Sequence, residues 1–255
     1  GKIFPINPTR PEVQGHKCYP SLADLPEAPE MVIVAVAGDN AIGAVEDCAA
    51  RGVKVAVVMA SGFGEVDAVA GKAKERHMVE VARKAGMRIV GPNSQGLANF
   101  GTGAIASFST MFMDMDRAEG HVAMLSQSGA LSTVPVGFLR QKGIGVRHTH
   151  ATGNDADITV GELAVAVAED PEVKLLLLYL ESIPDKTYLE ELAAVALDRD
   201  LPIIALKSGR TEAGRQAAQS HTGALANEDR VVDAFFEHHG IWRAPDMRGL
   251  VEATE

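Results

Sequence analysis

The feature that most constrains the fold is a repeated alternation of short apolar runs with amphipathic segments. Apolar runs at 31–38 ("MVIVAVAG"), 53–65 and 87–96 each read as a strand that ends in a polar or glycine turn. Helical patterns at 40–52 and 73–86 separate them, and each ends at a glycine. This β-α-β-α-β order is typical of a doubly wound parallel sheet.

The alternation stops and then resumes along the rest of the chain. Residues 97–120 show no helical period, and their Met-Phe-Met cluster favours a connector packed over a core, with a substrate-lining role as the alternative. Strands are expected again within 121–129, 144–155, 173–183 and 201–210, and helices within 130–143, 158–170, 188–200 and 229–240. We therefore expect an α/β protein of two successive doubly wound domains, 1–118 and 119–255, divided near residues 118–120.

Composition narrows the choice of partners and compartment. The 255 residues carry a formal net charge of -10, which argues against a nucleic-acid face or binding to an anionic membrane. No apolar run reaches the roughly 18 residues that a membrane span needs. Cys18 and Cys48 have no CxxC spacing, so we expect free thiols, no structural zinc and a cytoplasmic location.

The loops after the expected strands are rich in Gly, Ser and Asn, which suits phosphate-bearing ligands. The loop "LSQSGAL" is the most informative, because a strand ends at Leu125 and a helix is expected to start near Gly129. First-turn amides have no intrahelical partner and the helix dipole is positive there, so a phosphoryl group is favoured at this end. Walker A and GxGxxG patterns are missing, and Ser128 lacks the preceding glycine of a serine-hydrolase elbow.

The stretch "SHTGALANED" (220–229) poses a separate question about His221. The residue types alone allow a surface histidine beside a helix, a metal ligand or a catalytic nucleophile. The other histidines are scattered, and the close pairs His148/His150 and His238/His239 bring no third ligand, so a metal site is not expected.

Taken in order, six motifs resemble one enzyme family across essentially the whole chain. They are "GPNSQG", "LSQSGAL", "GNDADI", "YLESI", "LKSGRTEAG" and "SHTGALA". This series resembles the CoA-ligase portion of NDP-forming acyl-CoA synthetases, which are relatives of the succinyl-CoA synthetase α subunit. The resemblance implies a Rossmann-like CoA-binding domain followed by a flavodoxin-like ligase domain. The strand and glycine-rich loop that open the family's first domain have no counterpart in this sequence.

The resemblance also implies roles for individual residues. His221 would be transiently phosphorylated, and Glu181 would orient it; a carboxylate partner fixes the imidazole tautomer and supports the cation that forms. Thr133 stands where the succinate-specific relative has a tyrosine, which implies a substrate contact and argues against succinate. The implied phosphate-binding residues are Ser128, Gly129 and Ala130, and the implied CoA-binding residues are Pro8, Met59, Ala60, Ser61 and Asn93.

The implied activity is an acid–thiol ligase that forms acyl-CoA from a carboxylic acid, CoA and ATP. The route passes through an acyl phosphate and a phosphohistidine. ATP or ADP with Mg²⁺ would bind an ATP-grasp domain or subunit that this chain lacks, and an oligomer is expected. Two alternatives stay open at this point: a non-catalytic CoA- or acyl-CoA-sensing module, and a nicotinamide-dependent oxidoreductase, which the missing dinucleotide fingerprint disfavours.

Overall fold

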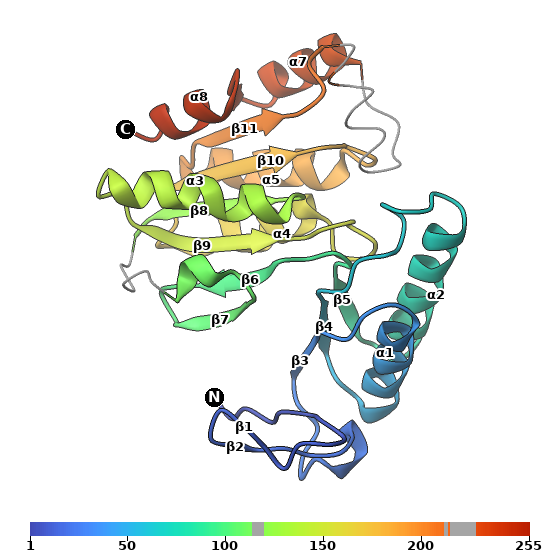
Figure 1. Ribbon diagram of the computed structural model, residues 1–255. Coiled ribbons are helices and arrows are strands. Elements are labelled where there is room, and N and C mark those ends of the chain that lie inside the picture. Colours follow the sequence, from blue (N-terminus) through green and yellow to red (C-terminus); the bar gives the residue numbers. More distant parts are fainter. Residues whose placement is uncertain (114–119, 212–213, 215–227) are drawn as a thin grey trace.

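The computed structural model describes residues 1–113, 120–211, 214 and 228–255. The described strands form sheets of two, seven and three strands. Figure 1 shows the three-stranded sheet and its helices as one unit and the seven-stranded sheet with its helices as another. The chain runs from the first unit into the second, so the α/β class predicted from the sequence is confirmed.

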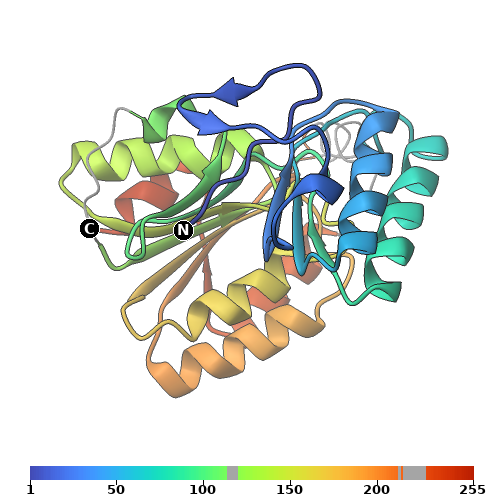
Figure 2. The ribbon, with the colours of Figure 1, turned by 90° about the horizontal axis from the view of Figure 1, so that it is seen from below.

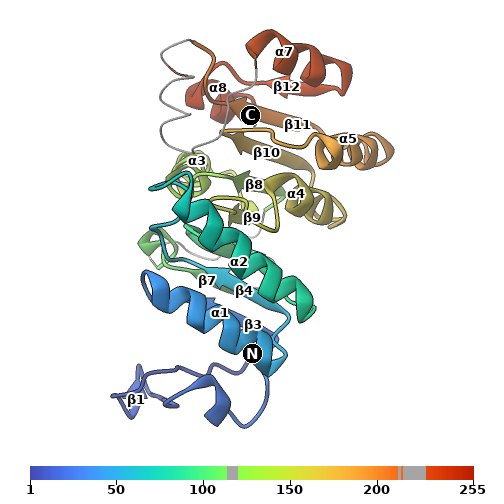
Figure 3. The same cartoon turned by 90° about the vertical axis from the view of Figure 1, so that its right-hand side faces the viewer.

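The first unit is a small parallel sheet with strand order β3-β4-β5. Helices α1 and α2 lie against the same face of this sheet (Figures 2 and 3). Helix α1 ends where Gly52 adopts φ 81°, a left-handed conformation that glycine reaches without a Cβ clash. The elements are β3 (Met31–Val34), α1 (Asp39–Arg51), β4 (Val55–Val58), α2 (Ala70–Lys84) and β5 (Arg88–Val90), preceded by the β1–β2 hairpin (Glu12–Val13, His16–Lys17) and a 3-10 turn (Leu22–Asp24).

The second unit is a seven-stranded sheet with strand order β12-β11-β10-β8-β9-β6-β7. The five strands from β12 to β9 are parallel. Numbered along the chain from β8, their order is the flavodoxin-like 2-1-3-4-5, which has its switch point between β8 and β10. The five strands are β8 (Val122–Ser126), β9 (Val146–Ala151), β10 (Leu175–Leu180), β11 (Ile203–Lys207) and β12 (Ile241–Arg243).

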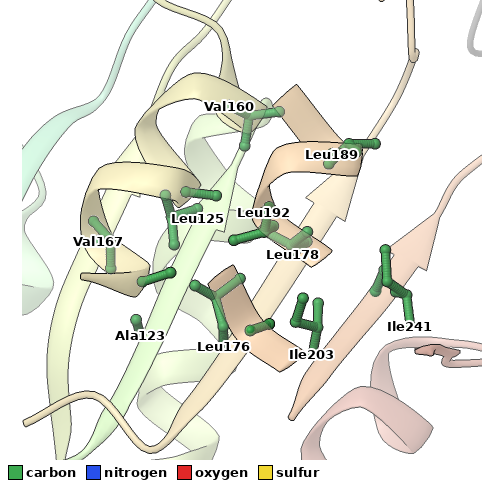
Figure 4. Close-up of a cluster of buried hydrophobic side chains, with 14 of the residues drawn as sticks. Ala123, Leu125, Val160, Val167, Leu176, Leu178, Leu189, Leu192, Ile203 and Ile241 are labelled. Atoms are coloured by element: carbon green, nitrogen blue, oxygen red, sulfur yellow. The ribbon is translucent and has the colours of Figure 1, made fainter. Parts of the chain in front are cut away.

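Helices cover both faces of the second sheet. One core packs α4, α5 and α7 against the sheet, and Figure 4 shows its leucine, valine and isoleucine side chains. A second core packs α3 and α8 against the opposite face. Strands β8, β10 and β11 are mostly apolar, as expected where both faces are buried, whereas β9 carries Arg147, His148, Thr149 and His150. The helices are α3 (Gly129–Gln141), α4 (Val160–Ala168), α5 (Thr187–Arg199), α7 (Asp229–His238) and α8 (Met247–Glu252).

The connector predicted at 97–120 contains regular structure in the part that the structure describes. Strands β6 (Gly96–Asn99) and β7 (Ala104–Ser107) form an antiparallel hairpin, and β6 pairs antiparallel with β9. A 3-10 turn follows at Thr110–Phe112. Strand pairing therefore joins 96–107 to the second sheet, whereas the predicted division at 118–120 adjoins residues outside the described ranges.

The two units are joined along the loop after β9. Its amides at Asn154, Ala156 and Ile158 donate to the carbonyls of Pro92, Gly91 and Ile89 at 3.0, 3.2 and 3.0 Å. The loop thus runs beside the end of β5 as an added strand would. No helix within the described ranges is long and apolar enough to cross a bilayer.

Candidate functional site

A cavity of about 820 Å³ opens at the carboxyl ends of the strands, where the two units meet. It includes the loops after β8 and β10, which flank the switch point of the second sheet. Ligands of open α/β sheets bind at such a point. The lining residues on which the following paragraphs rely are Met59, Glu65, Lys72, Glu75, Arg76, Asn93, Gln127, Ser128, Gly129, Ala130, Asn154, Asp155 and Glu181.

The N-terminus of α3 forms one wall of this cavity. Ser128 is the N-cap, and its Oγ accepts a hydrogen bond from Leu131 N at 3.5 Å. Gly129 and Ala130 follow as the first helical residues, and their amides belong to the turn that has no intrahelical acceptor. A Cβ on Gly129 would lie 3.1 Å from Gln95 Cβ, so glycine suits this close approach. The wall therefore offers amides and a positive dipole to an anion.

Glu181 lies immediately after β10 and also lines the cavity. Its amide donates to Gln127 Oε1 at 2.5 Å, and the amide of Ser182 donates to the same oxygen at 3.0 Å. Gln127 belongs to the loop that leads into α3. One side chain therefore links the end of β10, which carries the Glu181 carboxylate, to the loop that leads into the N-terminus of α3.

Asp155, in the loop after β9, is the second carboxyl group of this wall. Its Oδ2 accepts from Gln127 Nε2 at 2.8 Å and from Val160 N at 3.1 Å. Burial raises the pKa of Asp155 to about 6, and the negative charge of Glu181 acts in the same direction. The hydrogen bonds from Gln127 and Val160 oppose that rise, because they favour the charged form.

The first unit supplies the opposite, more charged wall. Asn154 Nδ2 donates to Glu65 Oε2 at 2.5 Å and to Glu75 Oε1 at 2.7 Å, so this amide bridges the units. Glu75 is buried and pairs with Lys72 at 2.8 Å. Burial disfavours ionisation of Glu65, but hydrogen bonds from Asn154 and the backbone outweigh it and lower its pKa. Lys72 and Arg76 bring positive charge to the cavity from α2.

The structure brings together six of the residues predicted for the site and leaves others apart. Thr133 is buried in α3, where its Oγ1 donates to Ala130 O at 3.2 Å, and it does not line the cavity. Pro8, Ala60 and Ser61 do not line it either. His221 lies outside the described residues. The six that share the cavity are Met59, Asn93, Ser128, Gly129, Ala130 and Glu181.

Sequence reasoning missed several cavity residues for different reasons. Gln127 and Asp155 stand in loops that the sequence singled out, yet nothing local indicates that their side chains meet. Lys72 and Arg76 occur in an amphipathic helix, where charges usually face solvent. Only the tertiary arrangement shows that this helix end turns toward the loops of the second unit.

The buried histidines of β9 form a pair rather than a metal centre. His148 Nδ1 lies 3.1 Å from His150 Nε2, and His148 Nε2 lies 2.9 Å from Asp170 Oδ2. Across the residues that the structure describes, no group of three or more His, Cys, Asp or Glu side chains is arranged to hold a metal ion.

Comparison with known families assigns both units. Residues 119–255 match the family described as the succinyl-CoA ligase like flavodoxin domain. The chain belongs to this family. Residues 1–99 match a CoA binding domain. The order of the two domains agrees with the Rossmann-like and flavodoxin-like arrangement that the motifs implied, so the resemblance to NDP-forming acyl-CoA synthetases is confirmed.

Individual relatives support the same family. The ADP-forming acetate–CoA ligase of Methanocaldococcus jannaschii is 37% identical over 252 residues, covering 99% of this chain and 34% of that protein. The α subunit of ADP-forming acetate–CoA ligase II from Pyrococcus furiosus is 36% identical over 241 residues, covering 94% of this chain and 51% of that protein. A solved structure from Candidatus Korarchaeum cryptofilum, a dinucleotide-forming acetyl-coenzyme A synthetase 1 in complex with phosphate and ADP, matches with TM-score 0.89 and 37% identity, covering 97% of this chain and 52% of that one. The chain thus spans between a third and about half of these relatives' length.

Proposed function

We propose that this chain is the CoA-binding and phosphoryl-transfer part of an ADP-forming acid–CoA ligase. The overall reaction is acid + CoA + ATP ⇌ acyl-CoA + ADP + phosphate. One observation carries the proposal: a single cavity contains Met59 and Asn93 of the CoA-binding unit, the N-terminus of α3 and Glu181. An acyl phosphate formed there would lie within reach of both the CoA-binding unit and Glu181.

The proposed chemistry assigns each group a limited task. The amides of Ser128, Gly129 and Ala130 hold the phosphoryl group, since they offer donors where negative charge must be stabilised. In the direction that forms ATP, His221 attacks the phosphorus of the acyl phosphate and the carboxylate of the acid departs. The phosphoryl group later passes from His221 to ADP. Glu181 orients the imidazole and stabilises its positive charge as the N–P bond forms. The reverse sequence forms the acyl phosphate from ATP.

The remaining assignments complete this proposal. Pro8, Ala60 and Ser61 extend the CoA site beyond the cavity, and Thr133 acts on the acid only through the packing of α3. ATP or ADP with Mg²⁺ binds an ATP-grasp domain or partner subunit, and the complete enzyme is an oligomer. Cys18 and Cys48 are buried and unpaired, which suits the reducing cytoplasm that we propose as its location.

The test uses the complete enzyme, including its nucleotide-binding part, with ATP labelled in the γ-phosphoryl group. Wild type is expected to acquire an acid-labile, base-stable label, as a phosphoramidate does. His221→Asn should acquire none and lose ligation while it still binds CoA. Glu181→Gln should acquire the label slowly, because Glu181 orients and stabilises rather than accepts the group. A His221→Asn enzyme with full ligase activity would contradict the mechanism and favour a CoA-sensing module.

A further inference from the structure

The side chain of Gln127 extends the pairing of β8 with β10 beyond the point where the main chain leaves the sheet. Strand β8 ends at Ser126, and Gln127 N still donates to Tyr179 O at 3.1 Å. Helix α3 begins two residues later, so the backbone turns away from β10. The amides of Glu181 and Ser182 then have no neighbouring β8 carbonyl to pair with.

The side-chain amide of Gln127 supplies the hydrogen bonds that the backbone of β8 no longer provides, with two at its oxygen and two at its nitrogen. Its Oε1 accepts from Glu181 N at 2.5 Å and from Ser182 N at 3.0 Å. Its Nε2 donates to Ser182 O at 3.1 Å and to Asp155 Oδ2 at 2.8 Å. Two donors face the oxygen and two acceptors face the nitrogen, so only this orientation of the amide satisfies every partner. The side chain is buried, which makes each of these bonds costly to lose.

Asp155 holds Gln127 from the side opposite to Glu181. Its Oδ2 also accepts from Val160 N, the first residue of α4. One connected group of hydrogen bonds therefore joins the loops after β8, β9 and β10. These three strands are neighbours in the sheet, so the loops are held at one edge.

We propose that Gln127 is a positioning residue that sets the place of Glu181 relative to the N-terminus of α3, and that Asp155 holds Gln127 in the orientation this requires. The inference rests on the proposed function, because Glu181 must face the phosphorylated histidine for its place to matter. The main chain of Glu181 is bonded directly to the residue that precedes the Ser128 N-cap. A shift of this strand end would change the distance between carboxylate and phosphoryl group, and a misplacement of about 1 Å can slow a reaction about 100-fold.

The decisive experiment is a double-mutant cycle on the rate of phosphohistidine formation from labelled ATP in the complete enzyme. Gln127→Met keeps the length of the side chain but removes its four hydrogen bonds. We expect it to label about 100-fold more slowly, with unchanged affinity for CoA. The double variant Gln127→Met/Glu181→Gln should be no slower than Glu181→Gln alone, since Gln127 acts through Glu181. Multiplied effects in the double variant, or a wild-type rate for Gln127→Met, would overturn the inference.

Matched variants distinguish a loss of positioning by Gln127 from a general loss of folding. Gln141→Met makes the same chemical change at the exposed end of α3 and should label at the wild-type rate. Asp155→Asn keeps an oxygen acceptor for Gln127 and should label much faster than Asp155→Ala; equal rates for the two would overturn the role of Asp155. The comparison of Asp155→Asn with Asp155→Ala still tests the inference if Gln127→Met does not fold. If wild type itself acquires no label, the proposed function fails; if only the Gln127 and Asp155 effects are missing, the positioning alone fails.

Discussion

Two helical glycines show how one methyl group can have opposite effects on stability. In α2, a Cβ on Gly71 would lie 2.0 Å from Phe63 O, a backbone atom that cannot move aside. In α1, a Cβ on Gly43 would meet nothing within 4 Å. We expect Gly71→Ala to lower the free energy of unfolding by about 2 kcal/mol through overpacking. Gly43→Ala should raise it by about 0.7 kcal/mol through helix propensity. Urea unfolding measures both, and equal effects of the two substitutions would show that the contact at Gly71 is not as close as described.

At the scale of elements, long periodic segments could be predicted and short ones could not. The helices at 40–52, 130–143 and 188–200 were expected close to their observed bounds, because an amphipathic repeat and a final glycine or charged turn specify them locally. The hairpin of β6 and β7 was missed. Its strands have only four residues each, half of them Gly or Ala, and the free edge of β9 rather than β-propensity specifies them.

The candidate site was predictable to the same extent. Topology places polar loops at one edge, so the meeting of Ser128 with Glu181 follows from strand order and loop sequence. The contacts of Gln127 and Asp155 do not follow, because they depend on how three loops approach one another. The position of Lys72 and Arg76 beside the cavity does not follow from the sequence either, because it depends on how the first unit packs on the second.

Strand β9 supplies a prediction on pH dependence. Burial lowers the pKa of His150 to about 3, and the neighbouring His148, itself beside Asp170, acts in the same direction. The unfolded chain binds a proton at this residue below about pH 6.5, whereas the folded protein does not until near pH 3, so stability falls as pH falls between these values. We expect His150→Leu to lose less stability than wild type between pH 7 and pH 5, by up to about 2 kcal/mol. Urea unfolding at both pH values measures the difference, and parallel losses would contradict the prediction.

At the scale of the whole molecule, an ionic cluster whose residues do not line the cavity joins the two units. Asp157, in the loop after β9, has a fully buried side chain that accepts from Ile89 N at 2.7 Å and from Arg83 and Arg88. Arg88, at the start of β5, also makes a bidentate pair with Glu162 of α4 at 2.8 and 2.9 Å. Burial opposes the charge of Arg88, but these carboxylates outweigh it and raise its pKa above the usual range. The loop that carries Asn154 and Asp155 into the cavity is therefore anchored at its far end by charge.

This anchoring predicts unequal roles for the two arginines that contact Asp157. Arg88→Met would remove the bidentate pair and leave the buried Asp157 carboxylate with fewer donors, so the free energy of unfolding should fall by about 3 kcal/mol. Arg83→Met is the matched control: the Arg83 side chain is 59% exposed, and its loss should cost less than about 1 kcal/mol.

Because the cluster joins the units, Arg88→Met should also weaken CoA binding in the complete enzyme, as the walls of the cavity separate, whereas Arg83→Met should not. Urea unfolding and calorimetric titration with CoA measure the two effects. Equal losses of stability and of CoA affinity for the two variants would contradict the unequal roles of Arg88 and Arg83.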